Sequence, residues 1–173
     1  QLKMFRHIAI HFLLIHCFTA FVFVQSAIQF STPQKMITEI LCFIKELENH
    51  PKDLPSDFFE TPTNVTNDKC LTSNMNVFKN ATHSFHFKNS NERMWRDRIY
   101  TNLKCIQDIC PRLNNTNEHG VCKERKSHIT NLLKHLKLYL GHVYSEDICP
   151  SALSKDIKCH TGLQDYRTEC PHL

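Results

Sequence analysis

The scarcity of glycine and the placement of proline limit this chain to a mostly helical fold. Its 173 residues contain only three glycines, too few for a turn-rich β protein. Proline, which breaks helices, is absent from residues 63–110 and again from residues 112–149. Long uninterrupted helices are therefore expected in these two windows.

Residues 1–26 have the outline of a secretory signal peptide. Lys3 and Arg6 supply a basic start, and residues 8–24 are almost entirely apolar. Cleavage is expected before Ala27. A membrane anchor is the alternative, but two histidines interrupt the run, and spanning the hydrocarbon core takes about 20 apolar residues. Secretion of the mature chain is the expected outcome.

The cysteines and the glycosylation sequons indicate the same compartment. One of the nine cysteines lies within residues 1–26, so an even number remains in the mature chain. An even count in a secreted domain indicates a disulfide framework. Three sequons predict N-linked glycans at Asn64, Asn80 and Asn114. The expected location is extracellular.

Charge and motifs argue against several other classes of function. Two of the 21 basic residues and none of the 17 acidic ones lie in residues 1–26, which leaves the mature chain at +2. Nucleic-acid-binding proteins usually carry a much stronger basic footprint. The sequence has no HExxH, CxxC, GxSxG or glycine-rich phosphate motif. We therefore expect no cofactor, no metal and no enzymatic activity.

Cysteine chemistry offers two rival hypotheses. A secreted cysteine hydrolase would need a free, activated thiolate, and an even count leaves no odd thiol for it. Cys159-His160 and Cys170 contain zinc-binding residue types, but their spacing does not fit a zinc finger. Disulfides are the expected state of these cysteines.

Four segments carry apolar residues at the three- and four-residue spacing of a helix that buries one face. They are residues 33–50, 71–82, 89–110 and 123–140. Thr32 and Pro33 suit an N-cap followed by the first helical position. Asn89 and Glu92 resemble a capping box, and Gly141 suits a left-handed C-terminal cap.

The apolar stripes of these segments predict the core. Trp95 falls on one of the stripes and is expected inside rather than as a binding anchor. The predicted core residues are Met36, Ile37, Ile40, Leu41, Ile44, Leu47, Met75, Phe78, Ala81 or Thr82, Trp95, Ile99, Leu103, Ile106, Cys110, Ile129, Leu132, Leu133, Leu136 and Leu140.

The lengths of the connections select the order of the helices. About 20 residues (50–69) separate the first two segments and about 11 (111–121) the last two, whereas the middle pair is joined by a short turn. Crossing a helix of about 25 Å is easy for the longer connection and just possible for the shorter one. The expected fold is an all-α, short-chain four-helix bundle with up-up-down-down topology. It would span residues 27–144, followed by a disulfide-rich, loop-rich tail at 145–173.

Residues 54–82 carry a family resemblance. A turn rich in Phe and Tyr, then Pro, Val and Cys, precedes a short helix in the interleukin-2/15/21 group of cytokines. The matching residues here are Phe58, Phe59, Pro62, Val65, Cys70 and Phe78. Asn91-Glu92-Arg93 is most similar to interleukin-21, and a non-mammalian interleukin-2 is the other leading choice. An interleukin-4/13-like cytokine has the same bundle physics and stays open.

The resemblance implies a disulfide between Cys70 and Cys122, the one cysteine directly before the last helix. Such a bridge closes a loop of about 50 residues and is worth ~4 kcal/mol in the chain-entropy model. Val77 stands where interleukin-15 and interleukin-21 have a second cysteine. One of the group's two bridges is therefore expected to be absent.

The resemblance also implies function. It predicts a monomeric, secreted cytokine that assembles class I cytokine receptor chains, namely the common gamma chain with a private or beta chain, to signal to lymphocytes. The group uses an acid on the first helix, residues of the third helix and a glutamine on the fourth, where this chain has Lys134. The candidate receptor-binding residues are Glu39, Arg93, Arg96, Asp97, Lys134 and Lys137.

For these candidates there is also an explanation that involves no receptor. Glu39 and Lys137 could be solvated surface charges, and Arg93 and Asp97 are spaced for an ion pair within one helix. An alternative function is a cysteine-stapled, membrane-active or antimicrobial protein, because the fourth helix combines leucines with lysines and histidines. The other apolar stripes favour a shared core instead.

Overall fold

The computed structural model describes residues 32–114, 121–145 and 148–149. All of them belong to one compact unit, Ser31–Leu173. The expected signal peptide lies outside the described residues, as do Cys159, Cys170 and nearly all of the expected tail.

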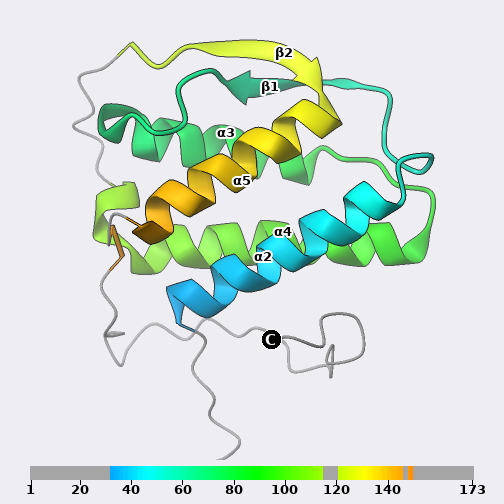
Figure 1. The fold of residues 1–173 in the computed structure, drawn as a ribbon, viewed down its shortest axis with the longest axis horizontal. Coiled ribbons are helices and arrows are strands. Elements are labelled where there is room, and N and C mark those ends of the chain that lie inside the picture. The colour runs from blue at the N-terminus through cyan, green and yellow to red at the C-terminus, as the bar shows by residue number, and fades with distance from the viewer. Residues whose placement is uncertain (1–31, 115–120, 146–147, 150–173) are drawn as a thin grey trace, which may run out of the picture. The chain divides into compact units, whose positions relative to one another are not determined.

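The described part of the chain is mostly helical (Figure 1). It contains four α-helices: α2 (Pro33–Asn49), α3 (Leu71–His83), α4 (Ser90–Ile109) and α5 (Ile129–Ser145). The long connections between them hold two short strands and two 3₁₀ turns: β1 (Phe58–Pro62), η1 (Asp68–Cys70), η2 (Pro111–Asn114) and β2 (Glu124–His128). The arrangement is compatible with a small helical bundle.

Local capping chemistry explains where two helices begin. The Thr32 hydroxyl accepts a hydrogen bond from the Lys35 N–H at 3.2 Å, and Pro33 occupies the first helical position. The Asn89 side chain accepts from the Asn91 N–H at 3.1 Å. Glu92 does not complete a full capping box, because its carboxylate meets the Asn89 side-chain amide at 3.3 Å.

The fourth helix differs from the prediction at both ends. It begins at Ile129 rather than near residue 123, because Glu124–His128 is extended and pairs with β1. It continues through Gly141 to Ser145, so the expected glycine cap is wrong. Val143 is buried, and this packing holds the helix beyond the glycine.

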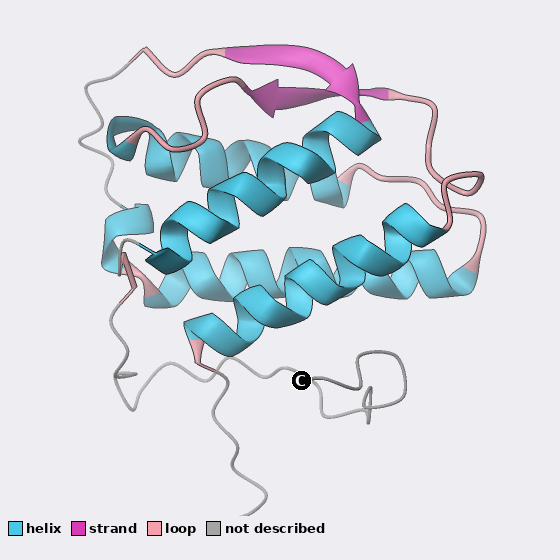
Figure 2. Ribbon diagram, viewed as in Figure 1, coloured by secondary structure: helices cyan, strands magenta, loops and turns pink. Residues whose placement is uncertain are grey.

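The two strands form an antiparallel ribbon between the two long connections (Figure 2). Its register runs from Phe58 opposite His128 to Pro62 opposite Glu124. The hydroxyls of Thr61 and Ser127 lie 2.6 Å apart across the ribbon. This small sheet was not expected, because its pairing joins segments that are far apart in the sequence.

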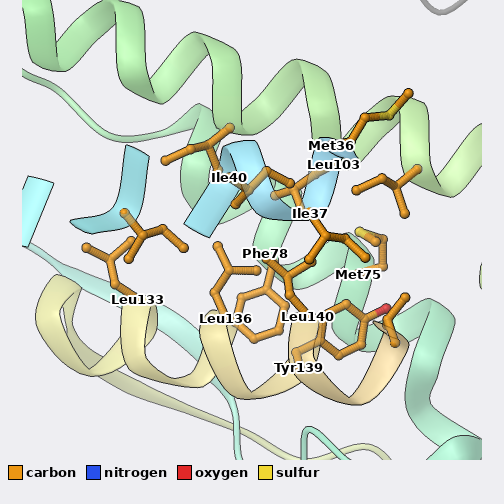
Figure 3. Packing of buried hydrophobic residues seen from close by; sticks show 14 of the residues in the cluster. Met36, Ile37, Ile40, Met75, Phe78, Leu103, Leu133, Leu136, Tyr139 and Leu140 are labelled. Atoms are coloured by element: carbon orange, nitrogen blue, oxygen red, sulfur yellow. The ribbon is translucent and has the colours of Figure 1, made fainter. Parts of the chain in front are cut away.

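The apolar stripes meet in one core (Figure 3). All predicted core residues are buried except Leu41, which is half-buried at the edge, and Trp95 is confirmed as a core residue. Phe43, Phe85 and Tyr139 are fully buried and were not predicted. The Tyr139 hydroxyl satisfies its polar end by donating to the Leu71 carbonyl at 2.9 Å.

Disulfides cross-link the connections to the helices. Cys70 is bonded to Cys122, with an S–S distance of 2.02 Å, which is the pairing that the resemblance implies. Cys110 at the end of α4 is bonded to Cys149. Cys42 and Cys105 each take part in a disulfide as well. Within the described ranges, no helix is long and apolar enough to span a bilayer.

Candidate receptor-binding faces

Glu39 is a half-buried carboxylate on one flank of α2. It lies nine positions before Glu48, which is about two and a half helical turns and puts the two side chains on opposite flanks. Glu48 accepts hydrogen bonds from the Lys137 ammonium group of α5 at 2.7 and 2.9 Å. Glu39 therefore lies on the flank that faces away from α5. Its carboxylate makes no hydrogen bond or ion pair with any described residue.

Arg93 and Arg96, the two candidate arginines of α4, are engaged with their own chain. Arg93 donates to the Lys88 carbonyl and Arg96 donates to the Phe85 carbonyl, each at 2.8 Å. Both carbonyls belong to the short connection between α3 and α4. Asp97 pairs with Arg96 at 2.7 Å, not with Arg93 as the spacing suggested. These guanidinium groups hold the connection in place, whatever else they contact.

The outer face of α5 carries a lysine that has no partner within the described residues, beside exposed apolar side chains. Lys134 is exposed and has no partner among the described residues, whereas Lys137 is tied to Glu48 of α2. Leu138 lies one turn beyond Lys134 on the same face and is 53% exposed. Tyr144, near the end of the helix, is 56% exposed. Neither apolar residue was predicted as a candidate, although both fall outside the apolar stripe that predicts the core.

The three sequon asparagines are all exposed but differ in their surroundings. The Asn114 amide donates to the Gln107 carbonyl at 2.7 Å, and its sequon continues outside the described residues. The Asn64 carbonyl accepts from the Asn74 amide at 3.1 Å. The Asn80 amide makes no side-chain hydrogen bond within the described part of the chain and lies on the surface of α3.

One charged cluster joins the ends of three elements. Asp68 of η1 lies 2.9 Å from His142 of α5 and 3.6 Å from Arg112 of η2. Asp68 lies two residues before Cys70, and Arg112 lies two residues after Cys110. Across residues 32–114, 121–145 and 148–149, no group of three or more His, Cys, Asp and Glu side chains could hold a metal ion.

Comparisons with known proteins returned no relative of this chain. No protein-family model matches it, and neither a curated protein nor a solved structure does.

Proposed function

We propose that this protein is a secreted cytokine of the interleukin-2/15/21 kind that assembles class I cytokine receptor chains, including the common gamma chain. The observation that carries this proposal is the Cys70–Cys122 disulfide. The resemblance predicts that these two cysteines pair with each other, and they are bonded to each other in the structure. It ties the start of α3 to the connection that leads into α5.

The proposed bundle is up-up-down-down, with two long crossovers. Support comes from the direction of the chain, which runs from left to right along α2 and α3 in Figure 1 and from right to left along α4 and α5. Further support comes from the β1–β2 pairing, since each strand belongs to a different long connection. Connections that run beside each other along the helices suit crossovers better than tight turns.

Secretion is supported by the state of the cysteines. All six cysteines in the described ranges are disulfide-bonded. Disulfides of this number form and persist in oxidising compartments. The apolar segment at residues 8–24 and the three sequons agree with the same route.

Receptor binding is assigned to two faces with free functional groups. Glu39 offers a carboxylate with no partner in the described part of the chain, on the flank of α2 away from α5, where a receptor arginine or lysine would complement it. On α5, Lys134 is a cation with no partner among residues 32–114, 121–145 and 148–149, and Leu138 is an exposed apolar side chain beside it. Together they offer a partner an apolar contact and a cation that a carboxylate could complement.

Binding of the mature protein, residues 27–173, to purified receptor ectodomains tests the proposal. The common gamma chain is used alone and together with the interleukin-2 beta chain or the interleukin-21 receptor chain. We expect a ternary complex that Glu39→Lys weakens by about tenfold or more, equivalent to about 1.4 kcal/mol. Asp108→Lys makes the same charge reversal on the exposed surface of α4 and serves as the control.

Absence of binding to all three receptor chains, from a folded monomer, would refute the family assignment. Within the described residues, the packing of α5 argues against the alternative membrane-active function. The leucine face of α5, including Leu132, Leu133 and Leu136, is buried in the core. Presenting that face to a bilayer would require the fold to open.

A further inference from the structure

A shallow groove of about 340 Å³ lies between β1 and α3. This volume is at the low end of the ~300–1,000 Å³ typical of small-molecule sites. Its lining includes Phe58, Glu60, Val77, Asn80, Ala81 and Glu124. Phe58 is 60% exposed on a strand that packs against α3.

The lining of this β1–α3 groove combines apolar surface with free hydrogen-bond acceptors. Phe58, Val77 and Ala81 supply the apolar part, and the Phe58 ring is backed by His128 with a centroid distance of 4.2 Å. Glu60 and Glu124 are exposed, and their carboxylates have no partner among the described residues. A pyranose ring presents C–H groups on one face and hydroxyl donors at its edge. An aromatic ring beside carboxylate acceptors therefore suits a sugar.

A sugar also has a point of attachment in the groove itself. Asn80 is part of the lining, is exposed and begins the sequon Asn80-Ala81-Thr82. Its side-chain amide makes no hydrogen bond within the described residues. Asn114, in contrast, has its amide bound to the Gln107 carbonyl, and neither Asn64 nor Asn114 lines this groove.

We propose that Asn80 carries an N-linked glycan whose first N-acetylglucosamine packs in the β1–α3 groove against Phe58. The proposal rests on the secretion inferred above, because only the secretory pathway supplies the transferase. In the transfer, Asn80 Nδ2 forms a bond to C1 of a lipid-linked oligosaccharide. The bond from C1 to the lipid pyrophosphate breaks, and the amide loses one proton to the transferase.

The fold sets the order of these events. Thr82, the hydroxyl residue of the sequon, is fully buried and donates to the Phe78 carbonyl at 2.7 Å. The transferase can read that hydroxyl only before α3 packs. The glycan is added to the unfolded chain, and folding then brings β1 and Phe58 alongside the sugar. Packed there, the sugar covers the exposed ring and strengthens the contact between β1 and α3.

The test uses the full chain expressed in a secreting eukaryotic cell line. Peptide mass spectrometry of the secreted protein measures occupancy at each sequon, and we expect Asn80 to be glycosylated. The protein is then trimmed with an endoglycosidase that leaves one N-acetylglucosamine on each site. We expect this trimmed protein to melt about 2–4 °C above the Asn80→Gln variant treated in the same way.

A double-mutant comparison isolates the contact with the ring. In a Phe58→Ala background, removal of the Asn80 sugar should change the melting temperature by less than about 1 °C, whereas Phe58→Tyr should keep the full difference. Asn64→Gln, which removes a sugar from outside the groove, is the matched control. A difference that persists in Phe58→Ala would overturn the proposal.

The two proposals fail in different ways. Secreted protein with sugar on Asn64 or Asn114 but a bare Asn80 would overturn the groove assignment alone. A chain that is not exported and carries no sugar at any of the three sites would contradict the secreted function, and with it the glycan.

Discussion

Asn102 of α4 is fully buried, and neither atom of its amide has a hydrogen-bond partner among the described residues. Burying an unpaired amide costs about 1–3 kcal/mol in proteins. Asn102→Leu keeps a similar volume and removes both polar atoms. We expect it to raise the free energy of unfolding by about 1–3 kcal/mol, measured by chemical denaturation.

Asn74 provides the matched control for Asn102. It is also buried, but its amide donates to the Asn64 carbonyl at 3.1 Å. Asn74→Leu removes this hydrogen bond and should lower the free energy of unfolding by about 1 kcal/mol or more. The prediction requires that Asn102→Leu raises the free energy of unfolding and that Asn74→Leu lowers it. Destabilisation by Asn102→Leu would show that its amide has a partner in solution.

Gly141 is the second position where a single residue limits stability. It lies inside α5, is exposed, and a Cβ atom placed there would meet nothing within 4 Å. Alanine has a higher helix propensity than glycine and a smaller entropy loss on folding. We expect Gly141→Ala to raise the free energy of unfolding by about 0.5–1 kcal/mol in chemical denaturation. Gly141→Pro should lower it by about 3 kcal/mol, and a loss with alanine would contradict the helical assignment.

At the scale of elements, helices whose ends are set by local chemistry could be predicted from the sequence. The Thr32 cap and the proline at residue 51 bound α2, and Asn89 with Pro111 bounds α4. The β1–β2 ribbon could not be predicted, because its polar second strand shows no strand pattern and its pairing depends on the tertiary fold. The same pairing explains why α5 begins later than expected.

For the candidate binding residues too, some properties could be predicted from the sequence and others could not. The sequence placed Glu39 and Lys134 off the apolar stripes, and both have side chains available for a partner. It could not indicate that Arg96 would reach the Phe85 carbonyl or that Lys137 would reach Glu48, because those contacts join separate elements. The spacing of charges within one helix therefore predicts the contacts of a charged side chain less well than the elements that lie beside it.

The two fully described disulfides are expected to stabilise the fold by similar amounts. Their partners are 52 residues apart for Cys70–Cys122 and 39 for Cys110–Cys149. The entropy of loop closure depends only on the logarithm of that length and gives about 4 kcal/mol for each bridge. We expect each double cysteine-to-alanine variant to lose about 2–4 kcal/mol in chemical denaturation. A much larger loss for one bridge would show that it organises native contacts as well.

At the scale of the whole molecule, the long connections do more than join helices. They pair with each other as β1 and β2. The Cys70–Cys122 disulfide also links them, because Cys70 ends η1 in the first connection and Cys122 lies in the second. Neither the ribbon nor this bridge uses the flank of α2 that carries Glu39 or the outer face of α5 that carries Lys134. Cross-linking through the connections leaves both proposed binding faces open.

Under the proposed function, the position of these two faces has a consequence for how receptor chains assemble. Glu39 lies on the flank of α2 that faces away from α5, and Lys134 lies on the outer face of α5. Two receptor chains could then bind at the same time without sharing contacts. Changes on one face should leave the affinity of the other face unchanged, because distant sites act additively.

Lys134→Glu and Leu138→Ala test this independence. Lys134 has no partner in the described part of the chain, and Leu138 is largely exposed. We therefore expect neither substitution to change the thermal stability. Loss of a hot-spot contact costs about 2 kcal/mol, or roughly 30-fold in affinity. We expect that loss for the receptor chain that binds α5, and less than about twofold for the chain that binds near Glu39. Lys104→Glu, an exposed lysine on α4, is the control.

A Lys134→Glu protein that keeps one receptor chain and loses the other becomes a competitor. It occupies the first chain without recruiting the second, so it should inhibit signalling by the wild-type protein in a mixing experiment on responsive cells. Adding Glu39→Lys to it should abolish that inhibition, because neither chain is then held. If Lys134→Glu weakened both receptor chains equally while the melting temperature stayed constant, the two faces would form one continuous site. The proposed division between α2 and α5 would then be wrong.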